Sequence, residues 1–328
     1  MWPLAPFPKL QIYMLSTVLF ILSISTPSLA SGTSTGLERD ANGKFNFVGY
    51  FPSSVLTAIA FVLILATALT QTYFMVKQGG RYMLTMVIAE YTLAIGFAMR
   101  FPLHSNPYSM IVFIVEQLFI VLSPCGFIAG NYILLGRLAM WLKCGQYMLV
   151  PAEKITKFFV LSDVFTFGIQ STGSSLMISK TQTTSQIGTH MFLAGLILQL
   201  VSFAFFTILY VKLLFSVYKF QPRIWSKDCG NKEWYNDWRS LAFALCLSCF
   251  GIIVRSVYRI IEASQGPRGK FAITESLFYG LDTLPLFIAI VVFTPFWPGR
   301  YIPNKLAEED YENVQVNSFG TVQILDAI

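Results

Sequence analysis

Seven long apolar segments, separated by loops that hold most of the basic residues, run through this sequence. They cover residues 52–76, 82–101, 111–136, 155–178, 189–215, 240–262 and 274–296. An apolar stretch of about 20 residues is long enough for a helix to cross the hydrocarbon core of a bilayer. Because backbone groups in lipid must be satisfied within the protein, such stretches form helices. The sequence therefore predicts an all-α membrane protein, a seven-transmembrane helix bundle over residues 51–298.

Composition excludes a soluble domain and argues against a nucleic acid partner. Of the 328 residues, 55% are hydrophobic and only 12% are charged, and the mean hydropathy is +0.60. Soluble domains have about 25% charged residues. The net charge of +6 is not gathered into a basic tract interleaved with aromatic residues, which is the usual sign of nucleic acid binding.

The basic residues are unequally divided between the two sets of loops. Fourteen lie in the loops that would share one side of the membrane, and six lie in the loops of the other side. The side richer in Lys and Arg is the cytosolic one. We therefore expect the N-terminus outside, the C-terminus inside and residues 299–328 to form a cytosolic tail.

The first 30 residues have the features of a secretory signal peptide. Lys9 precedes a short apolar core at residues 13–24, and Ser28 and Ala30 are small residues at positions −3 and −1 of a cleavage site. Cleavage would leave residues 31–50 as a short extracellular N-terminus. Retention of an additional helix is the alternative.

Signatures of catalysis and of nucleotide binding are missing. The sequence has no G-x-x-x-x-G-K-[ST] loop. Its only histidines, His104 and His190, are expected in or beside external loops, so a zinc enzyme is not expected. We expect no enzymatic activity, no cofactor, no metal site and no nucleotide partner.

Ionisable residues inside the last two apolar segments form the second strong constraint. Two sets of three residues recur at spacings i, i+4 and i+7. They are Arg255, Arg259 and Glu262 in the sixth segment and Glu275, Tyr279 and Asp282 in the seventh. Each set forms a stripe on one face of a helix. A charge facing lipid costs about 2.5–3.5 kcal/mol, so the two stripes are predicted to face each other or a wet cavity.

Other polar residues are expected to face the same interior. The candidate residues for a ligand site or translocation pathway are Glu90, Glu116, Asp163, Gln170, Gln199, Arg255, Arg259, Glu262, Glu275, Tyr279 and Asp282. Ser123 shares a face with Glu116, and Pro124 beside it is expected to kink the helix and free a carbonyl near that face. Two other interpretations stay open. The polar residues could simply bond to one another and hold the bundle together, or Arg255 and Arg259 could extend to the lipid headgroups.

Two hypotheses about these residues are specific. Arg259, Glu262 and Glu275 are expected to form a charge network near the outer end of the bundle. Asp282 lies about 12 Å into its segment, too deep for its short side chain to reach water. A carboxylate there must be neutral, paired or hydrated. We expect Asp282 to contact a ligand headgroup or to carry a coupled proton.

Several short motifs follow one another in a fixed order along these segments. They are Ala89-Glu90-Tyr91 with Arg100, Leu122-Ser123-Pro124, Asn131-Tyr132, Asp163 with Ile169-Gln170, Gly195 with Gln199, Arg255 with Tyr258-Arg259 and Glu262, and Glu275, Tyr279 and Asp282. This ordered set, over residues 50–302, resembles the fungal lipid-translocating exporters, the "resistance to aminocholesterol" group. The resemblance implies a plasma-membrane protein that handles amphipathic molecules such as sphingoid long-chain bases and gives resistance to toxic amphiphiles.

Three functions remain open at this point. A translocator could receive the amine of a cationic amphiphile on Glu90, Asp163 or Asp282 while the tail stays in lipid. A seven-span receptor or sensor is favoured by the orientation and by Arg137 at the inner end of the third segment, although the acidic residue common before that Arg is missing. A regulator that alters lipid asymmetry through another protein is the third. Membrane lipids and amphipathic small molecules are the expected partners, and the oligomeric state stays open.

Overall fold

The structure of the chain is a computed structural model. It describes residues 53–105, 110–142, 152–177, 181–220, 237–266, 269, 271 and 274–302. The predicted signal peptide (residues 1–30), the predicted extracellular N-terminus (31–50) and all but the first residues of the predicted cytosolic tail (299–328) lie outside the described residues. Those assignments therefore stay predictions.

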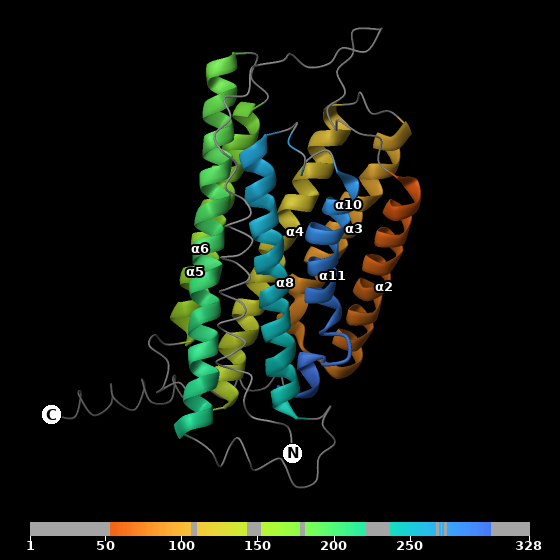
Figure 1. Cartoon of the computed structure of the whole chain (residues 1–328). Helices are drawn as coiled ribbons and strands as arrows, with labels where there is room; N and C mark the ends of the chain where they lie inside the picture. The colour runs from red at the N-terminus through yellow and green to blue at the C-terminus, as the bar shows by residue number, and fades with distance from the viewer. Residues whose placement is uncertain are drawn as a thin grey trace, which may run out of the picture.

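The described part of the chain is helical and forms one bundle (Figure 1). Its long helices are α2 (Ser54–Gln78), α3 (Leu84–Ser105), α4 (Met110–Trp141), α5 (Ala152–Met177), α6 (Gln182–Phe220) and α8 (Trp238–Gln265). A last helical run changes its winding along its length: α10 (Glu275–Leu277), the π-helical turn η4 (Phe278–Thr283) and α11 (Leu284–Val291). We call this run the seventh helix. Two 3₁₀ turns, η1 (Arg81–Met83) and η5 (Pro298–Arg300), are short connections.

Five helical stretches within the described ranges are long and apolar enough to cross a membrane. They are Ser54–Gln78, Arg81–His104, Ile111–Trp141, Gln182–Lys219 and Trp238–Gln265. α5 carries more polar residues, and the seventh helix is divided by its π-helical turn. The fold is thus that of a multi-pass, all-helical membrane protein.

Most helix limits lie within a few residues of those predicted, but one prediction is clearly wrong in length. The fifth segment was predicted at 189–215, whereas α6 begins at Gln182 and ends at Phe220. Hydropathy detects only the apolar part of a helix, and the backbone bonds of α6 continue into polar residues. One of these, Ser185, donates from its hydroxyl to the carbonyl of Met177 in α5 at 3.0 Å. The start of α6 is therefore anchored by α5 rather than by lipid.

Glycines bring α5 and α6 into close contact. A Cβ atom at Gly173 would lie 2.6 Å from the backbone nitrogen of Phe192, and one at Gly188 would lie 2.6 Å from that of Met177. Both distances are shorter than van der Waals contact, so the two backbones meet where neither residue has a side chain. Figure 1 shows the two helices side by side over most of their length.

The end of α2 is joined to the end of the seventh helix. Gly79 and Gly80 have φ angles of 78° and 91°, which residues with a Cβ atom rarely adopt. The turn that they form presents the carbonyl of Gly79 to the indole nitrogen of Trp297 at 3.0 Å, and Trp297 is fully buried. This contact fixes one end of the seventh helix, and the polar residues of interest lie toward its other end.

Candidate functional site

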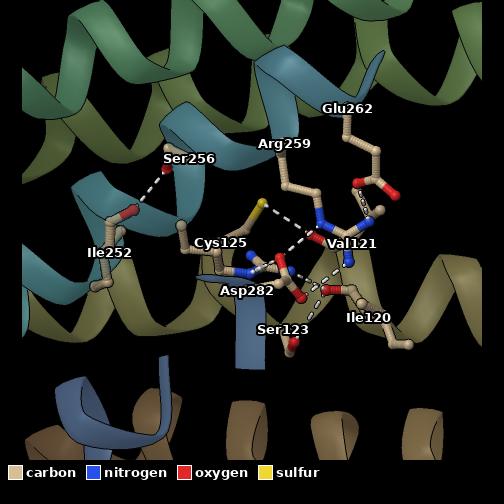
Figure 2. Close-up of polar contacts among 10 residues, drawn as sticks. Ile120, Val121, Ser123, Cys125, Ile252, Ser256, Arg259, Glu262 and Asp282 are labelled. Carbon is tan, nitrogen blue, oxygen red and sulfur yellow. Dashed lines mark hydrogen bonds and ion pairs between the residues drawn. The ribbon is translucent and has the colours of Figure 1, made fainter. Parts of the chain in front are cut away.

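Two arginines of α8 bind one carboxylate of the seventh helix inside the bundle. Arg255 donates from Nε to Asp282 Oδ1 at 3.0 Å, and Arg259 donates from Nε to Oδ1 at 2.7 Å and from Nη2 to Oδ2 at 3.0 Å. The side chains of Arg255, Arg259 and Asp282 are only 6%, 11% and 3% exposed. Figure 2 shows Arg259 pointing toward Asp282. The contact confirms that the sixth and seventh segments face each other, and it excludes extension of these arginines to the lipid headgroups.

A further contact ties α8 to α4. Pro124 has no N–H, so the carbonyl oxygen of Ile120, four residues earlier, lacks its helical donor. Arg255 donates from Nη2 to this oxygen at 2.9 Å, and Ser123 donates from Oγ at 3.2 Å. Ser123 and Ile120 lie beside Asp282 in Figure 2. The prediction that Pro124 frees a carbonyl near the polar interior is confirmed, and Arg255 and Ser123 both donate to it.

Two more ion pairs lie beside the contacts of Arg255 with Asp282 and Ile120. Arg259 donates from Nη1 to Glu262 Oε2 at 3.0 Å, and Arg100 of α3 lies with its Nε 3.5 Å from Glu116 Oε1 of α4. Both pairs contact the ring of Phe278, with the guanidinium carbon of Arg100 4.4 Å and that of Arg259 5.6 Å from its centroid. Three cations thus balance three anions. We call these six residues the ion cluster: Arg100, Glu116, Arg255, Arg259, Glu262 and Asp282.

The seventh helix does not present its three predicted residues on one face. Glu275 Oε1 accepts a hydrogen bond from the backbone N–H of Ser53 at 2.7 Å, and the hydroxyl of Tyr279 lies 3.0 Å from that of Thr57 in α2. Asp282 instead faces α8. The π-helical turn over Phe278–Thr283 adds residues to the turn and rotates Asp282 away from Glu275. The predicted network of Arg259, Glu262 and Glu275 is therefore wrong in one member, because Asp282 takes the place of Glu275.

A second polar region joins α4, α5 and α6. Gln170 donates from Nε2 to Gln199 Oε1 at 2.8 Å, and Gln199 donates from Nε2 to the sulfur of Cys125 at 3.5 Å. On the same helix as Gln170, Asp163 is buried, and its backbone carbonyl accepts from the hydroxyl of Thr166 at 2.9 Å. The bonds of Gln170, Gln199 and Cys125 hold α4, α5 and α6 together, as the structural interpretation of the polar residues predicted, whereas the bond of Thr166 lies within α5.

Two of the predicted site residues, Glu90 and Asp163, have buried carboxyl oxygens without a hydrogen-bond partner. Both oxygens of Glu90 in α3 are buried without a hydrogen-bond partner, and so is Oδ1 of Asp163. Neither residue belongs to an ion pair within the described ranges. The predicted site residues therefore divide into members of the ion cluster, a pair of amides (Gln170 and Gln199), two contacts to α2 (Glu275 and Tyr279) and two carboxyl groups with at least one oxygen that lacks a donor (Glu90 and Asp163).

Sequence reasoning assigned Arg100 to the wrong place. It is one of the six basic residues that the sequence assigns to the external side, because it lies at the end of the second apolar segment, yet it is 2% exposed and paired with Glu116. Its position four residues after Gly96, which packs against α4, was the available signal. Removing Arg100 from the external set lowers that set from six to five and makes the charge asymmetry of the loops larger.

Several yeast proteins are similar to the chain in sequence, but no solved structure matches it. Three relatives from Saccharomyces cerevisiae are Protein RTA1, Protoporphyrin uptake protein 1 and Sphingoid long-chain base transporter RSB1. They are 30%, 31% and 26% identical to the chain over 226, 201 and 241 residues. These matches cover 69%, 61% and 64% of the chain and 68%, 63% and 62% of the relatives. The model of the RTA1-like protein family matches residues 86–305, and the chain therefore belongs to that family.

Proposed function

We propose that this chain is a membrane translocator of amphipathic lipids such as sphingoid long-chain bases or related toxic amphiphiles, and that it gives resistance to them. It spans the membrane seven times, α2, α3, α4, α5, α6, α8 and the seventh helix being the spans, with the N-terminus outside and the C-terminus cytosolic. It reaches the plasma membrane through the secretory pathway. It acts without enzymatic chemistry and without a cofactor.

The single observation that carries this proposal is a buried polar interior inside a lipid-facing bundle. Glu90 and Asp163 keep acceptor oxygens without donors in that interior. A cationic amine supplies the donors that such oxygens lack, while the tail of the amphiphile stays in lipid. The names of two relatives, a sphingoid long-chain base transporter and a protoporphyrin uptake protein, support a role in moving amphiphiles.

The contacts divide the candidate residues into those that hold helices in place and those that line the proposed pathway of the amphiphile. Asp282 is balanced by two guanidinium groups, so we assign it, with the rest of the ion cluster, to holding helices in place. Asp163 is buried on α5, and Gln170, which bonds to Gln199 of α6, lies two helical turns along the same face. We assign Asp163 to contact with the ligand amine, in place of the headgroup contact expected for Asp282.

Reconstitution in liposomes tests the function. Purified protein should move a fluorescently labelled sphingoid base between leaflets faster than protein-free liposomes do, with no other protein present. Asp163→Asn should slow this movement, whereas Ser175→Ala, at an exposed hydroxyl of α5 that bonds only to its own helix at Ser171, should not. Binding of the base without movement would favour a receptor or sensor instead.

The topology has its own test. A tag inserted after Ala327 should be protected from protease in intact cells, and a tag at Ser34 should be accessible. The basis is the excess of basic residues in one set of loops. A protease-accessible C-terminal tag would contradict the seven-span arrangement.

A further inference from the structure

Glu90 is the most completely isolated carboxyl group in the described part of the chain. Its exposed fraction is 0%, and neither Oε1 nor Oε2 has a hydrogen-bond partner. On α2, Gln71 is equally buried, and its Oε1 also lacks a donor. The hydroxyls of Thr72 and Tyr91, the residues that follow these two, lie 3.0 Å apart, which sets Gln71 and Glu90 at the same depth in the bundle.

The register of the helices places Glu90 toward the seventh helix. Phe97 of α3 contacts the rings of Phe278 and Tyr279, with each centroid 6.4 Å away. Glu90 precedes Phe97 by seven residues, so it lies on the same face of α3 about two turns deeper. Gln71 reaches the seventh helix at that depth, because its Nε2 donates to the carbonyl of Ile290 at 2.9 Å. Glu90 is thus deeper in the bundle than the ion cluster.

The titratable groups on the surrounding helices are engaged with other partners. Asp282 is bound by Arg255 and Arg259, the thiol of Cys125 in α4 accepts from Gln199 and donates to Val121, and Tyr91 bonds with Thr72. On α2, Lys77 bonds with Tyr73 at an exposed position. Glu116 and Tyr279 bond with Arg100 and Thr57. None of these groups supplies Glu90 with a counter-charge.

A carboxyl group in such surroundings is stable as the neutral acid, because an ionised one would have neither donors nor a cation to balance it. We propose that Glu90 is a proton-binding site that couples movement of the amphiphile to movement of protons. Glu90 holds a proton in the conformation described here. It releases that proton to water when the helices around it separate, and it takes another from the opposite side of the membrane. This inference rests on the proposed function, and it names the ion that would drive it.

Chemical labelling tests the proton site without measuring transport. Dicyclohexylcarbodiimide enters apolar regions and adds to protonated carboxyl groups, the acid proton passing to a carbodiimide nitrogen and the carboxyl forming an acylurea. Mass spectrometry of the full-length protein in lipid vesicles should find the adduct on Glu90, with more adduct at lower pH. The same spectra contain their own control, because ion-paired Asp282 should stay unlabelled. No adduct on Glu90, or equal labelling of Asp282, would overturn the proposal.

Transport gives the second measurement. Native protein should move a labelled sphingoid base faster across a pH gradient than without one, and Glu90→Gln should lose that stimulation. Thr92→Ala is the matched control on α3, since its exposed hydroxyl bonds only to Ile88 of the same helix, and it should keep the stimulation. A normal gradient response in Glu90→Gln would refute the coupling role. Absence of movement by native protein, with Glu90 still labelled, would instead refute the proposed function.

Discussion

Arg255 of α8 donates to the carbonyl oxygen of Ile120 in α4 at 2.9 Å, where it replaces the amide hydrogen that Pro124 lacks. The same guanidinium donates to Asp282 of the seventh helix at 3.0 Å. One buried side chain therefore fastens three helices. A proline that would weaken an isolated helix becomes, in this bundle, the acceptor for an interhelical bond.

This arrangement predicts that residues 124 and 255 are energetically coupled. Arg255→Gln should remove the guanidinium donor to Ile120 and leave only the hydroxyl of Ser123, and Pro124→Ala should add a donor through the new backbone N–H. In the Arg255→Gln background, Pro124→Ala should therefore return about 1 kcal/mol more stability than it does in the native chain. Thermal unfolding of the four proteins in detergent measures this coupling. Strictly additive effects would mean that Arg255 does not serve the Ile120 carbonyl.

Asp282 is predicted to be more important for folding than Glu262, although both carboxylates bind Arg259. Asp282→Asn removes the anion that two buried guanidinium groups share, at a cost of roughly 3–5 kcal/mol. Glu262 has a side chain that is 22% exposed and pairs with Arg259 alone, so Glu262→Gln should cost about 1 kcal/mol or less.

Size-exclusion chromatography of detergent-solubilised protein distinguishes these outcomes. Asp282→Asn should give little monodisperse protein, and Glu262→Gln should give a normal yield. If Asp282→Asn folds normally and only transport is lost, Asp282 acts on the ligand or on a proton, as the sequence alone suggested.

Glu275 is predicted to act through its acceptor oxygen rather than through its charge. Its Oε1 accepts the backbone N–H of Ser53 at 2.7 Å, and a glutamine offers an oxygen at the same position. Glu275→Gln should change stability by less than about 0.5 kcal/mol, whereas Glu275→Ala should lose about 1 kcal/mol. The comparison of their thermal midpoints in detergent checks this. A large loss in Glu275→Gln would show that the negative charge itself is required.

The helices and the polar interior could be predicted from sequence because both depend on local patterns. An apolar run of sufficient length identifies a helix, and the spacing of Arg255, Arg259 and Glu262 identifies its buried face. The limits of α6 could not be predicted in the same way, because its ends lie in polar residues that hydropathy assigns to loops.

The partners of the buried charges could be predicted only in part. Spacing at i, i+4 and i+7 assumes 3.6 residues per turn, and the π-helical turn at Phe278–Thr283 breaks that assumption. Glu275 was therefore assigned to the wrong neighbours. Arg100 and Glu116 pair between two different segments, and the periodicity within one segment does not show such a contact. Whether a carboxyl group such as that of Glu90 lacks a hydrogen-bond donor depends on all the helices that surround it.

The close approach of α5 and α6 predicts opposite effects for two glycines of the same helix. A Cβ atom at Gly173 would meet the backbone nitrogen of Phe192 at 2.6 Å and the carbonyl oxygen of Gly188 at 2.9 Å. These are backbone atoms and cannot turn aside, so Gly173→Ala should push the helices apart and cost about 1–3 kcal/mol. A Cβ atom at Gly168 would have nothing within 4 Å of it, so Gly168→Ala should leave stability unchanged or raise it by up to about 1 kcal/mol through helix propensity. Thermal unfolding of both variants in the same detergent measures the difference, and equal midpoints would contradict the close contact of the two helices.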